Sequence, residues 1–428
     1  ALEEAHQRFG KALELIEAEP GCVDDLFLAD VLIKWGRVYL HRADFFALRA
    51  LLEPYLPKME GLGDRRRLSL VLSWLALSHV FSGNGPVAKP LLERALAIAR
   101  EAGDDECIAM AARSLVWLYA CWIPDNVQSE AMVARYYALA MESAEKINNV
   151  IVMIGVTVAR SRHLEWLGRF PEARSYASKL VEIGRRYRDT RSLSYAQWSL
   201  GFTNLYEERY QEALECAEQS LQLSPDMLDE LCASGVKGVA LSFTGRVAEG
   251  FEIVSKVRQG IIRTGFLPLL GGIDIPYGAV LVQAGHLKIG ERHLNDAITY
   301  WTSLGNYPVP VWAHLALGDL YARLVMGTMN LSPGAMLKNF GFLVRNFPVA
   351  RRRARHHYEH VVRCARTFNM PWLLARALYS LGELSRAKKR HEEARAYYEE
   401  ALQAAESWEF EIAGKIRSAL NSLEKSKR

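Results

Sequence analysis

The stretch WSLGFTNLYEERYQEALECAEQSLQLSP, residues 198–225, decides the fold of this chain. Small residues stand at Gly201, Ala213 and Ser220, separated by twelve and then seven positions. Two helices that cross closely need small side chains at the crossing points, because a larger Cβ substituent would push the backbones apart. Pro225 is placed to end the second helix, since it has no N–H to donate and clashes with the preceding turn. The stretch therefore predicts a packed pair of antiparallel helices.

The same spacing recurs along the chain. In YSLGELSRAKKRHEEARAYYEEAL, residues 379–402, the small residues are Gly382, Ala394 and Ala401. Loop-forming residues also recur, at Gly63, Gly103, Asn148, Asp189, Pro225, Gly265 and Gly305. The resulting period of about 40 residues, with two helices in each, is typical of a helical solenoid. We expect an all-α, right-handed superhelical solenoid of about nine antiparallel helix pairs over residues 1–428, with a capping helix at about 409–425.

This alternation of small and large residues resembles that of tetratricopeptide repeats, with repeats longer than that family's usual length of about 34 residues. The resemblance implies a surface that binds a partner inside the curve of the superhelix. We expect the first helix of each pair to line this concave groove, and Trp198 and Phe202 are the candidate groove residues.

Composition excludes several function classes. The formal net charge of +4 over 428 residues is small, and no aromatic–basic interleaving extends over several repeats, so the sequence argues against nucleic-acid binding. Six scattered cysteines without a CxxC pair predict thiols in a reducing compartment, and we expect a cytoplasmic protein. The most apolar run, residues 150–159, has about half the length of a membrane span. Because the chain opens with Ala inside a helical pattern, we interpret it as part of a longer protein.

One repeat departs from the period. The first helix around Gly318 should meet a small residue twelve positions later, but the matching segment begins at Ala354, so about 24 residues are inserted. We expect an amphipathic helix at about 327–350. Its apolar stripe comprises Leu337, Phe340, Leu343, Val344 and Phe347, and we expect it to start at Ser332-Pro333 and to end at Pro348.

The stretch ARRRARHHYEHVVRC, residues 350–364, follows the insert directly. His356, His360 and Cys364 are spaced for one helical stripe, but a metal site needs further ligands that the sequence does not supply nearby. We interpret the stretch as the second helix of its pair, with Ala354, Tyr358 and Val361 facing the core. The candidate docking residues are Leu337, Phe340, Leu343, Phe347, Arg351, Arg352, Arg353 and Arg355. They would hold an acidic protein groove or an anionic membrane surface; the alternative is that the stripe packs back on the solenoid.

The sequence holds no GxxxxGK[ST], GxGxxG, GxSxG or HExxH motif. We therefore predict no catalytic residue, no cofactor, no metal and no enzymatic activity for this chain. The predicted function is a regulatory, protein-binding repeat module. The alternative is an arm that binds a small-molecule effector, for which a closed aromatic and polar pocket, instead of an open polar trough, would be diagnostic.

Two stretches carry a second resemblance. LKNFGFLVRNFPVARRRARHHYE, residues 337–359, and residues 51–105 resemble the C-terminal repeat region of large bacterial signalling proteins of the class III adenylate/guanylate cyclase family. In those proteins a cyclase domain and an ATPase domain precede the repeats, so the resemblance implies signal transduction and a contact with the catalytic domains of the same full-length chain. The repeats also resemble the arm of the maltose-regulon activator and related signalling ATPases, which implies the effector-binding alternative.

Overall fold

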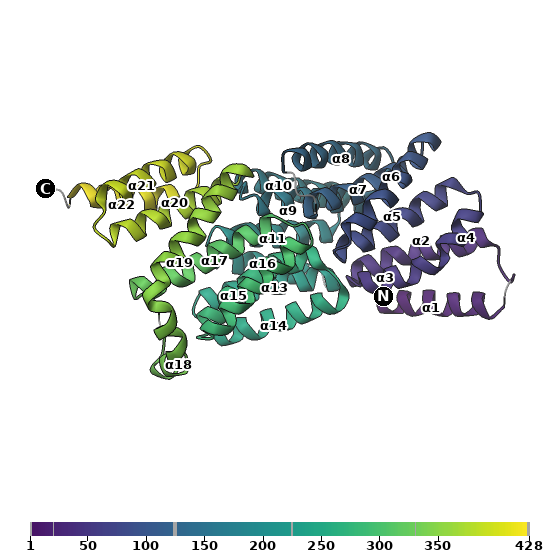
Figure 1. Ribbon diagram of the computed structural model, residues 1–428. Coiled ribbons are helices and arrows are strands. Elements are labelled where there is room, and N and C mark those ends of the chain that lie inside the picture. The colour runs from purple at the N-terminus through teal and green to yellow at the C-terminus, as the bar shows by residue number, and fades with distance from the viewer. Residues whose placement is uncertain (1, 20, 123–125, 224–225, 330, 426–428) are drawn as a thin grey trace.

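The computed structural model describes residues 2–19, 21–122, 126–223, 226–329 and 331–425, and this part of the chain forms helices and turns without a strand. Helices α1 to α11 span Leu2–Ala18, Asp25–Arg42, Phe45–Leu52, Leu56–Gly61, Arg65–Phe81, Gly85–Ala102, Asp105–Cys121, Asn126–Lys146, Val150–Trp166, Phe170–Tyr187 and Thr190–Tyr206, with a 3-10 turn at Glu53–Tyr55. Helices α12 to α22 span Tyr210–Leu223, Met227–Phe243, Val247–Thr264, Leu267–Gln283, Leu287–Ser303, Pro308–Met326, Pro333–Lys338, Phe340–Thr367, Pro371–Arg386, His391–Glu406 and Ile412–Lys425. Figure 1 shows an elongated array with α1 near one end and α22 at the other. The predicted all-α solenoid is confirmed.

Recurring aspartates start the first helix of successive pairs. The side chains of Asp64, Asp104 and Asp189 each accept a hydrogen bond from the backbone N–H three residues later, at the starts of α5, α7 and α11. An N-cap of this kind contributes about 1 kcal/mol to its helix. The caps fall at the predicted loops, so they set the period of the array. Pro225 lies outside the described residues, and α12 is described as far as Leu223.

Glycines mark the close crossings within and between pairs. A Cβ at Gly201 would lie 2.8 Å from Cγ1 of Val236 in the next pair. A Cβ at Gly318 would lie 2.6 Å from Cε1 of Tyr358, so α17 packs closely against α19. Since van der Waals contact between carbons begins at about 3.5 Å, these positions accept only glycine without a local rearrangement.

The array coils tightly enough for distant pairs to touch. Trp122, after α7, stacks on Trp301 of α16 with ring centroids 6.0 Å apart. Trp312 Nε1 of α17 donates to the backbone oxygen of Trp166 at the end of α9, at 3.0 Å. Helix α2 likewise contacts α13. The first helices of one turn of the superhelix therefore pack on those of the next turn, and the interior is closed.

This closure explains why first and second helices have different sequence patterns. Helix α9 is buried at every position from Val152 to Trp166, although it includes Arg160, Arg162 and Glu165. Helix α10, its partner, buries one face only. A helix enclosed on all sides has no solvent face, so its apolar residues show little helical periodicity.

The insert differs from its predicted form. Ser332 caps α18 as expected, but Pro348 lies inside α19 and does not end it. A proline removes one backbone hydrogen bond and frees the carbonyl of the residue four positions earlier, here Val344. Val344 is 57% exposed, so water can satisfy that carbonyl and the helix continues. The inserted helix and the second helix of the pair are therefore one continuous helix.

Among the described residues, no helix combines the length and the apolar character that crossing a membrane requires.

Candidate functional site

The two predicted groove residues are buried inside the closed superhelix. Trp198 is 4% exposed and Phe202 is fully buried. Trp198 Nε1 donates to Asp229 Oδ1 at 3.2 Å, and the Arg162 guanidinium lies 4.2 Å from the centre of the Phe202 ring. The expectation of an open concave groove lined by these side chains is therefore wrong. The reason is that the next turn of the superhelix covers the first helices and removes their apolar surface from water.

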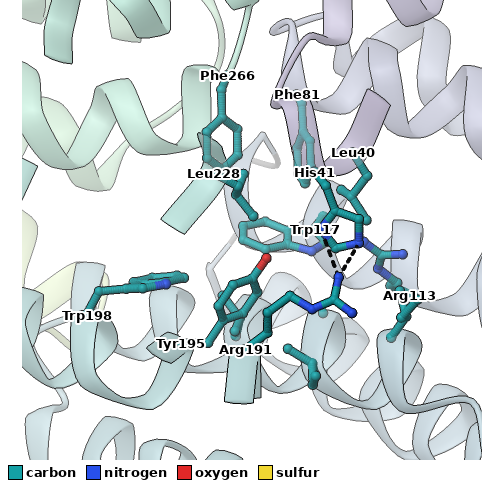
Figure 2. Close-up of a pocket in the computed structure, with 14 residues that line it drawn as sticks. Leu40, His41, Phe81, Arg113, Trp117, Arg191, Tyr195, Trp198, Leu228 and Phe266 are labelled. Carbon is teal, nitrogen blue, oxygen red and sulfur yellow. Dashed lines mark hydrogen bonds between the residues drawn. The ribbon is translucent and has the colours of Figure 1, made fainter. Parts of the chain in front are cut away.

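A cavity of about 50 Å³ remains where the two turns meet, lined by α2, α5, α7, α9, α11 and α13 and by Phe266. Figure 2 shows its aromatic wall, and the Tyr195 hydroxyl and the Arg191 guanidinium point toward its centre. The aromatic lining residues are Phe81, Trp117, Tyr195, Trp198 and Phe266. A water needs about 10–15 Å³, so this cavity has room for a few waters or for one small molecule.

Arg113 of α7 is the unusual member of this wall. It is 2% exposed, and its Nε and Nη1 have no hydrogen-bond partner among the described residues. Burial lowers the pKa of Arg113 to about 10, so the guanidinium stays charged at neutral pH. It lies against Gly155, where a Cβ would be 2.5 Å from Nε. Glycine at that position makes the space that the guanidinium occupies.

Trp117, one helical turn after Arg113, presents a second unpaired donor. Its indole Nε1 is buried and has no hydrogen-bond partner among the described residues. Burial raises the pKa of Tyr195 well above its usual value, so its phenol stays neutral. The cavity therefore holds a fixed cation and an indole N–H whose hydrogen-bonding capacity is unused.

A hydrogen-bonded chain joins the cavity wall to the opposite turn. Arg191 Nη1 lies 2.9 Å from His41 Nε2, and His41 Nδ1 lies 3.0 Å from Asp226 Oδ2. Because the guanidinium can only donate, Nε2 accepts and Nδ1 carries the hydrogen that is donated to Asp226. The chain links α2, α11 and the start of α13.

A wider hollow of about 770 Å³ adjoins the cavity and shares Ile151 and Arg191 with it. Arg37 of α2 lies in this hollow, and burial together with the charge of Arg191 lowers the pKa of Arg37. Arg66 is also present but is paired with Asp104, at 3.0 Å, and with Glu106. The hollow therefore places positive charge beside the cavity while carrying acidic groups of its own.

A second buried arginine on the neighbouring helix is fully paired. Arg162 forms an ion pair with Glu165, which is completely buried. Ser161 Oγ and Thr203 Oγ1 donate to Glu165 Oε1 at 3.1 and 3.3 Å. Burial of this kind is tolerated when each charge has a partner.

The candidate docking side chains of the insert lie on its outer face, with one exception. Leu337, Phe340 and Phe347 are 79%, 64% and 61% exposed, whereas Leu343 is half-buried and packs on the core. The buried face carries Phe342, Asn346 and Ala350 instead. The insert is fixed to the preceding pair, because Asn339 Nδ2 donates to the backbone oxygen of Gly285 at 2.7 Å.

The four arginines of the run serve different purposes. Arg353 Nη1 donates to Glu291 Oε1, Tyr321 Oη and Asn346 Oδ1, at 3.0, 2.7 and 2.7 Å. Arg355 forms an ion pair with Glu393 of α21.

These two arginines hold helices together, so they are not free docking groups. Arg352 is exposed and Arg351 is half-buried.

The histidines of this helix form a cluster with His314 of α17. His314 Nδ1 lies 2.9 Å from His357 Nδ1, and the rings of His314 and His360 are centred 4.0 Å apart. Cys364 Sγ lies 3.4 Å from His360 Nε2. In the described part of the chain, no three His, Cys, Asp or Glu side chains are arranged to hold a metal ion.

Sequence reasoning missed Arg113 as a site residue. The signal was a single arginine within IAMAARSLVWLYA, residues 108–120, a stretch with no other charged residue. Its lack of a partner depends on side chains from five other helices, and the sequence alone does not bring these together.

Comparison with known proteins supports the repeat assignment. Residues 156–226 match one tetratricopeptide repeat model and residues 375–407 match another. No curated protein matches the chain.

Two solved structures are similar at low identity. One is a signal transduction ATPase with numerous domains from Pyrococcus horikoshii, which has a tetratricopeptide repeat sensor; identity is 14%, the TM-score is 0.36, and the match covers 80% of this chain and 53% of that one. The chain thus spans about half the length of that protein. The other is the APC/C hetero-tetramer Cut9-Hcn1, at 12% identity and a TM-score of 0.33, covering 100% of this chain and 88% of that one. This chain is an all-α solenoid that contains tetratricopeptide repeats.

Proposed function

We propose that the array is a non-catalytic, protein-binding module of a larger bacterial signalling protein, and that it docks through the outer face of the insert. The observation that carries the proposal is a contiguous set of exposed apolar side chains on α18 and the start of α19. This insert face comprises Met336, Leu337, Phe340, Val344 and Phe347, which are between 49% and 79% exposed. Exposed apolar side chains gathered on one face are typical of a surface that a partner covers.

The charge around the insert face indicates the chemistry of the partner. From residue 320 to residue 358 the sequence has no Asp or Glu. Lys338, Arg345 and Arg352 are exposed there. Figure 1 shows α18 and the start of α19 projecting from the body of the array, where a partner has access. The complementary surface is an apolar groove bordered by acidic side chains.

We place that groove on the catalytic domains of the same full-length protein. The resemblance of residues 337–359 to the repeat region of cyclase-associated signalling proteins supports this choice. The parent would then be a cytoplasmic nucleotide cyclase with an ATPase domain, and the array would transmit regulation to it. Tetratricopeptide repeats in general mediate contacts between proteins, which favours a protein over an anionic membrane as the occupant.

A photo-crosslinker tests the docking. In the full-length protein, p-benzoylphenylalanine replaces Phe340, and the control carries it at Tyr300, which is 41% exposed on α16. We expect irradiation to join position 340 to an acidic surface of the catalytic domains, and position 300 to give background only. Mass spectrometry of the products identifies the contact.

Two results would count against this function. The first is crosslinking at position 340 no stronger than at position 300. The second is salt-sensitive binding of the array to vesicles containing phosphatidylserine that is lost when Leu337, Phe340 and Phe347 are all changed to Ser. That second result would assign the insert face to a membrane.

A further inference from the structure

The cavity between the two turns holds a charge that no described residue balances. Arg113 is 2% exposed and forms no ion pair among the described residues. Leaving a buried ion without a partner costs several kcal/mol, so folded proteins normally pair such groups, as Arg162 is paired with Glu165. The contrast between the two arginines indicates that the partner of Arg113 is not part of the described chain.

A second, independent group points to the same missing partner. Trp117 lines the same cavity, and its Nε1 is buried without an acceptor in the described part of the chain. Arg113 and Trp117 both line this cavity, and each has a buried donor without an acceptor among the described residues, which favours a ligand that is rich in acceptors. The nearby carboxylates do not fill this role, because Asp226 is bonded to His41 and Asp229 accepts from Trp198.

We propose that this cavity binds a small organic carboxylate, with Arg113 and Trp117 donating to its oxygens and the aromatic wall covering its apolar part. The proposal goes beyond docking through the insert and does not depend on it. It makes the interior of the array a ligand-sensing site.

Charge and size define the ligand class. Arg191 is already bonded to His41 and lies 4.0 Å from Asp189, so Arg113 is left to balance one negative charge. A second charge among the aromatic side chains would be buried without compensation. The cavity of about 50 Å³ admits a few water-sized groups, on the order of four or five non-hydrogen atoms. A guanidinium also matches the planar geometry of a carboxylate. These limits favour a short-chain monocarboxylate over a phosphate.

The position of the cavity suggests what binding does to the array. Its walls come from α2, α5 and α7 on one turn and from α13 and Phe266 on the next. A ligand that bonds to Arg113 and packs on Phe266 strengthens the contact between the turns. Because each repeat is held by its neighbours, tightening this contact changes the curvature that the array presents elsewhere.

Thermal unfolding with a matched pair of probes tests the site. Propionate is the charged probe and propionamide is its neutral isostere, both at constant ionic strength set with sodium chloride. We expect propionate to raise the unfolding temperature saturably, by about 3 °C at a hundredfold excess over its Kd, because it binds the folded state alone. Propionamide should leave it unchanged. Calorimetric titration of the folded array supplies the Kd.

Substitutions assign the effect to Arg113. Arg113→Met should abolish the propionate response or weaken affinity at least about tenfold, since a charge-assisted hydrogen bond is lost. Arg417→Met makes the same chemical change at an exposed position and should keep the response. If Arg113→Met does not fold, Gly155→Ala is used, because it retains the charge but occupies the space beside Nε. It should weaken the response.

Several outcomes would overturn the site. One is an equal propionate shift in the wild type and in the folded Arg113→Met variant, or, where that variant does not fold, in Gly155→Ala. Another is an equal effect of propionamide. A third is the absence of a saturable shift with acetate, propionate and butyrate alike. A response to inorganic phosphate but to no carboxylate would also contradict the ligand class.

Discussion

The closed interior and the insert face are both rich in aromatic and aliphatic side chains, but they have opposite exposures. Trp166, Trp301 and Phe202 are at most 1% exposed, and their neighbours come from helices that are far apart in sequence. Phe340 and Phe347 of the insert are 64% and 61% exposed. The comparison shows that an apolar stripe in a sequence predicts an apolar surface on a helix. Whether another part of the chain buries that surface depends on how the array coils.

The two regions also differ in how they treat charge. The interior holds Arg162 with Glu165 as a completed pair, and Arg113 with no ion-pair partner among the described residues. The insert surrounds its apolar face with exposed basic groups. Substitutions in the two regions should therefore distinguish the effects of charge pairing, core packing and solvent exposure on stability.

The largest effect is expected when the buried pair is broken. Arg162→Met leaves Glu165 completely buried without its cation, which should lower the free energy of unfolding by about 3–5 kcal/mol. Burial already raises the pKa of Glu165, and the substitution removes the cation that opposes this. The matched variant, Arg113→Met, removes an unpaired charge and should leave stability unchanged or increase it. Thermal and urea unfolding measure both, and equal losses would show that Arg113 has a partner in the folded chain.

Much of this architecture could be predicted from local pattern. The capping aspartates, such as Asp64 and Asp104, and the crossing glycines, such as Gly318 and Gly382, act over one or two helices. Their spacing therefore revealed the pairs and the insert. These features depend on contacts that are close in sequence.

Contacts between turns were not predictable in the same way. Trp198 and Phe202 were expected to line an open groove, and Arg113 was not recognised. Their environments depend on helices that are not neighbours in sequence: Leu40 of α2, for example, lines the same cavity as Arg113 and Trp198. Pro348 was expected to end a helix, and its tolerance depends on the exposure of Val344.

The next effect concerns a glycine that packs against backbone. A Cβ at Gly250 in α14 would overlap the backbone oxygen of Gly238 and lie 2.7 Å from the backbone nitrogen of Ser242. Since these atoms belong to a rigid helix, Gly250→Ala should cost about 2–3 kcal/mol. Gly414 of α22 has no atom within 4 Å of its Cβ position. Gly414→Ala should instead add up to about 1 kcal/mol. Equal changes in the unfolding temperature of the two variants would contradict the conclusion that close helix crossings require glycine.

The histidine cluster should make stability depend on pH. Burial, followed by the charges of neighbouring histidines, lowers the pKa of His314 to about 3 and that of His357 to about 4. The unfolded chain takes up protons below about pH 6.5, where the folded chain does not. The contribution of these neutral histidines to the free energy of unfolding is therefore fully present above about pH 6.5. It is lost as the pH drops toward 4, and the loss is about 2 kcal/mol per histidine at pH 5.

The comparison of unfolding at pH 7 and pH 5 measures this loss. His314→Gln cannot protonate, so the variant should show a smaller difference between the two pH values than the wild type. His391→Gln, on α21 and outside this cluster, should keep the wild-type difference. A wild type equally stable at both values would show that the cluster is accessible to protons.

The smallest effect on stability is expected at the insert face, and there the comparison is drawn on one helix. Changing Phe340 and Phe347 to Ser removes side chains that are mostly in water, so the free energy of unfolding should change by less than about 0.5 kcal/mol. Phe342 is 9% exposed on the opposite face of α19, and Phe342→Ser should cost about 3 kcal/mol or more, because it leaves a cavity and places a hydroxyl in it. If the array docks as proposed, docking should respond in the reverse order. The outer pair of substitutions should lower crosslinking of a probe at position 337 to the proposed partner, whereas Phe342→Ser should leave it intact wherever the variant is folded. If the outer pair destabilised the array as much as Phe342→Ser, the insert face would be part of the packed core and its exposure would not mark a binding surface.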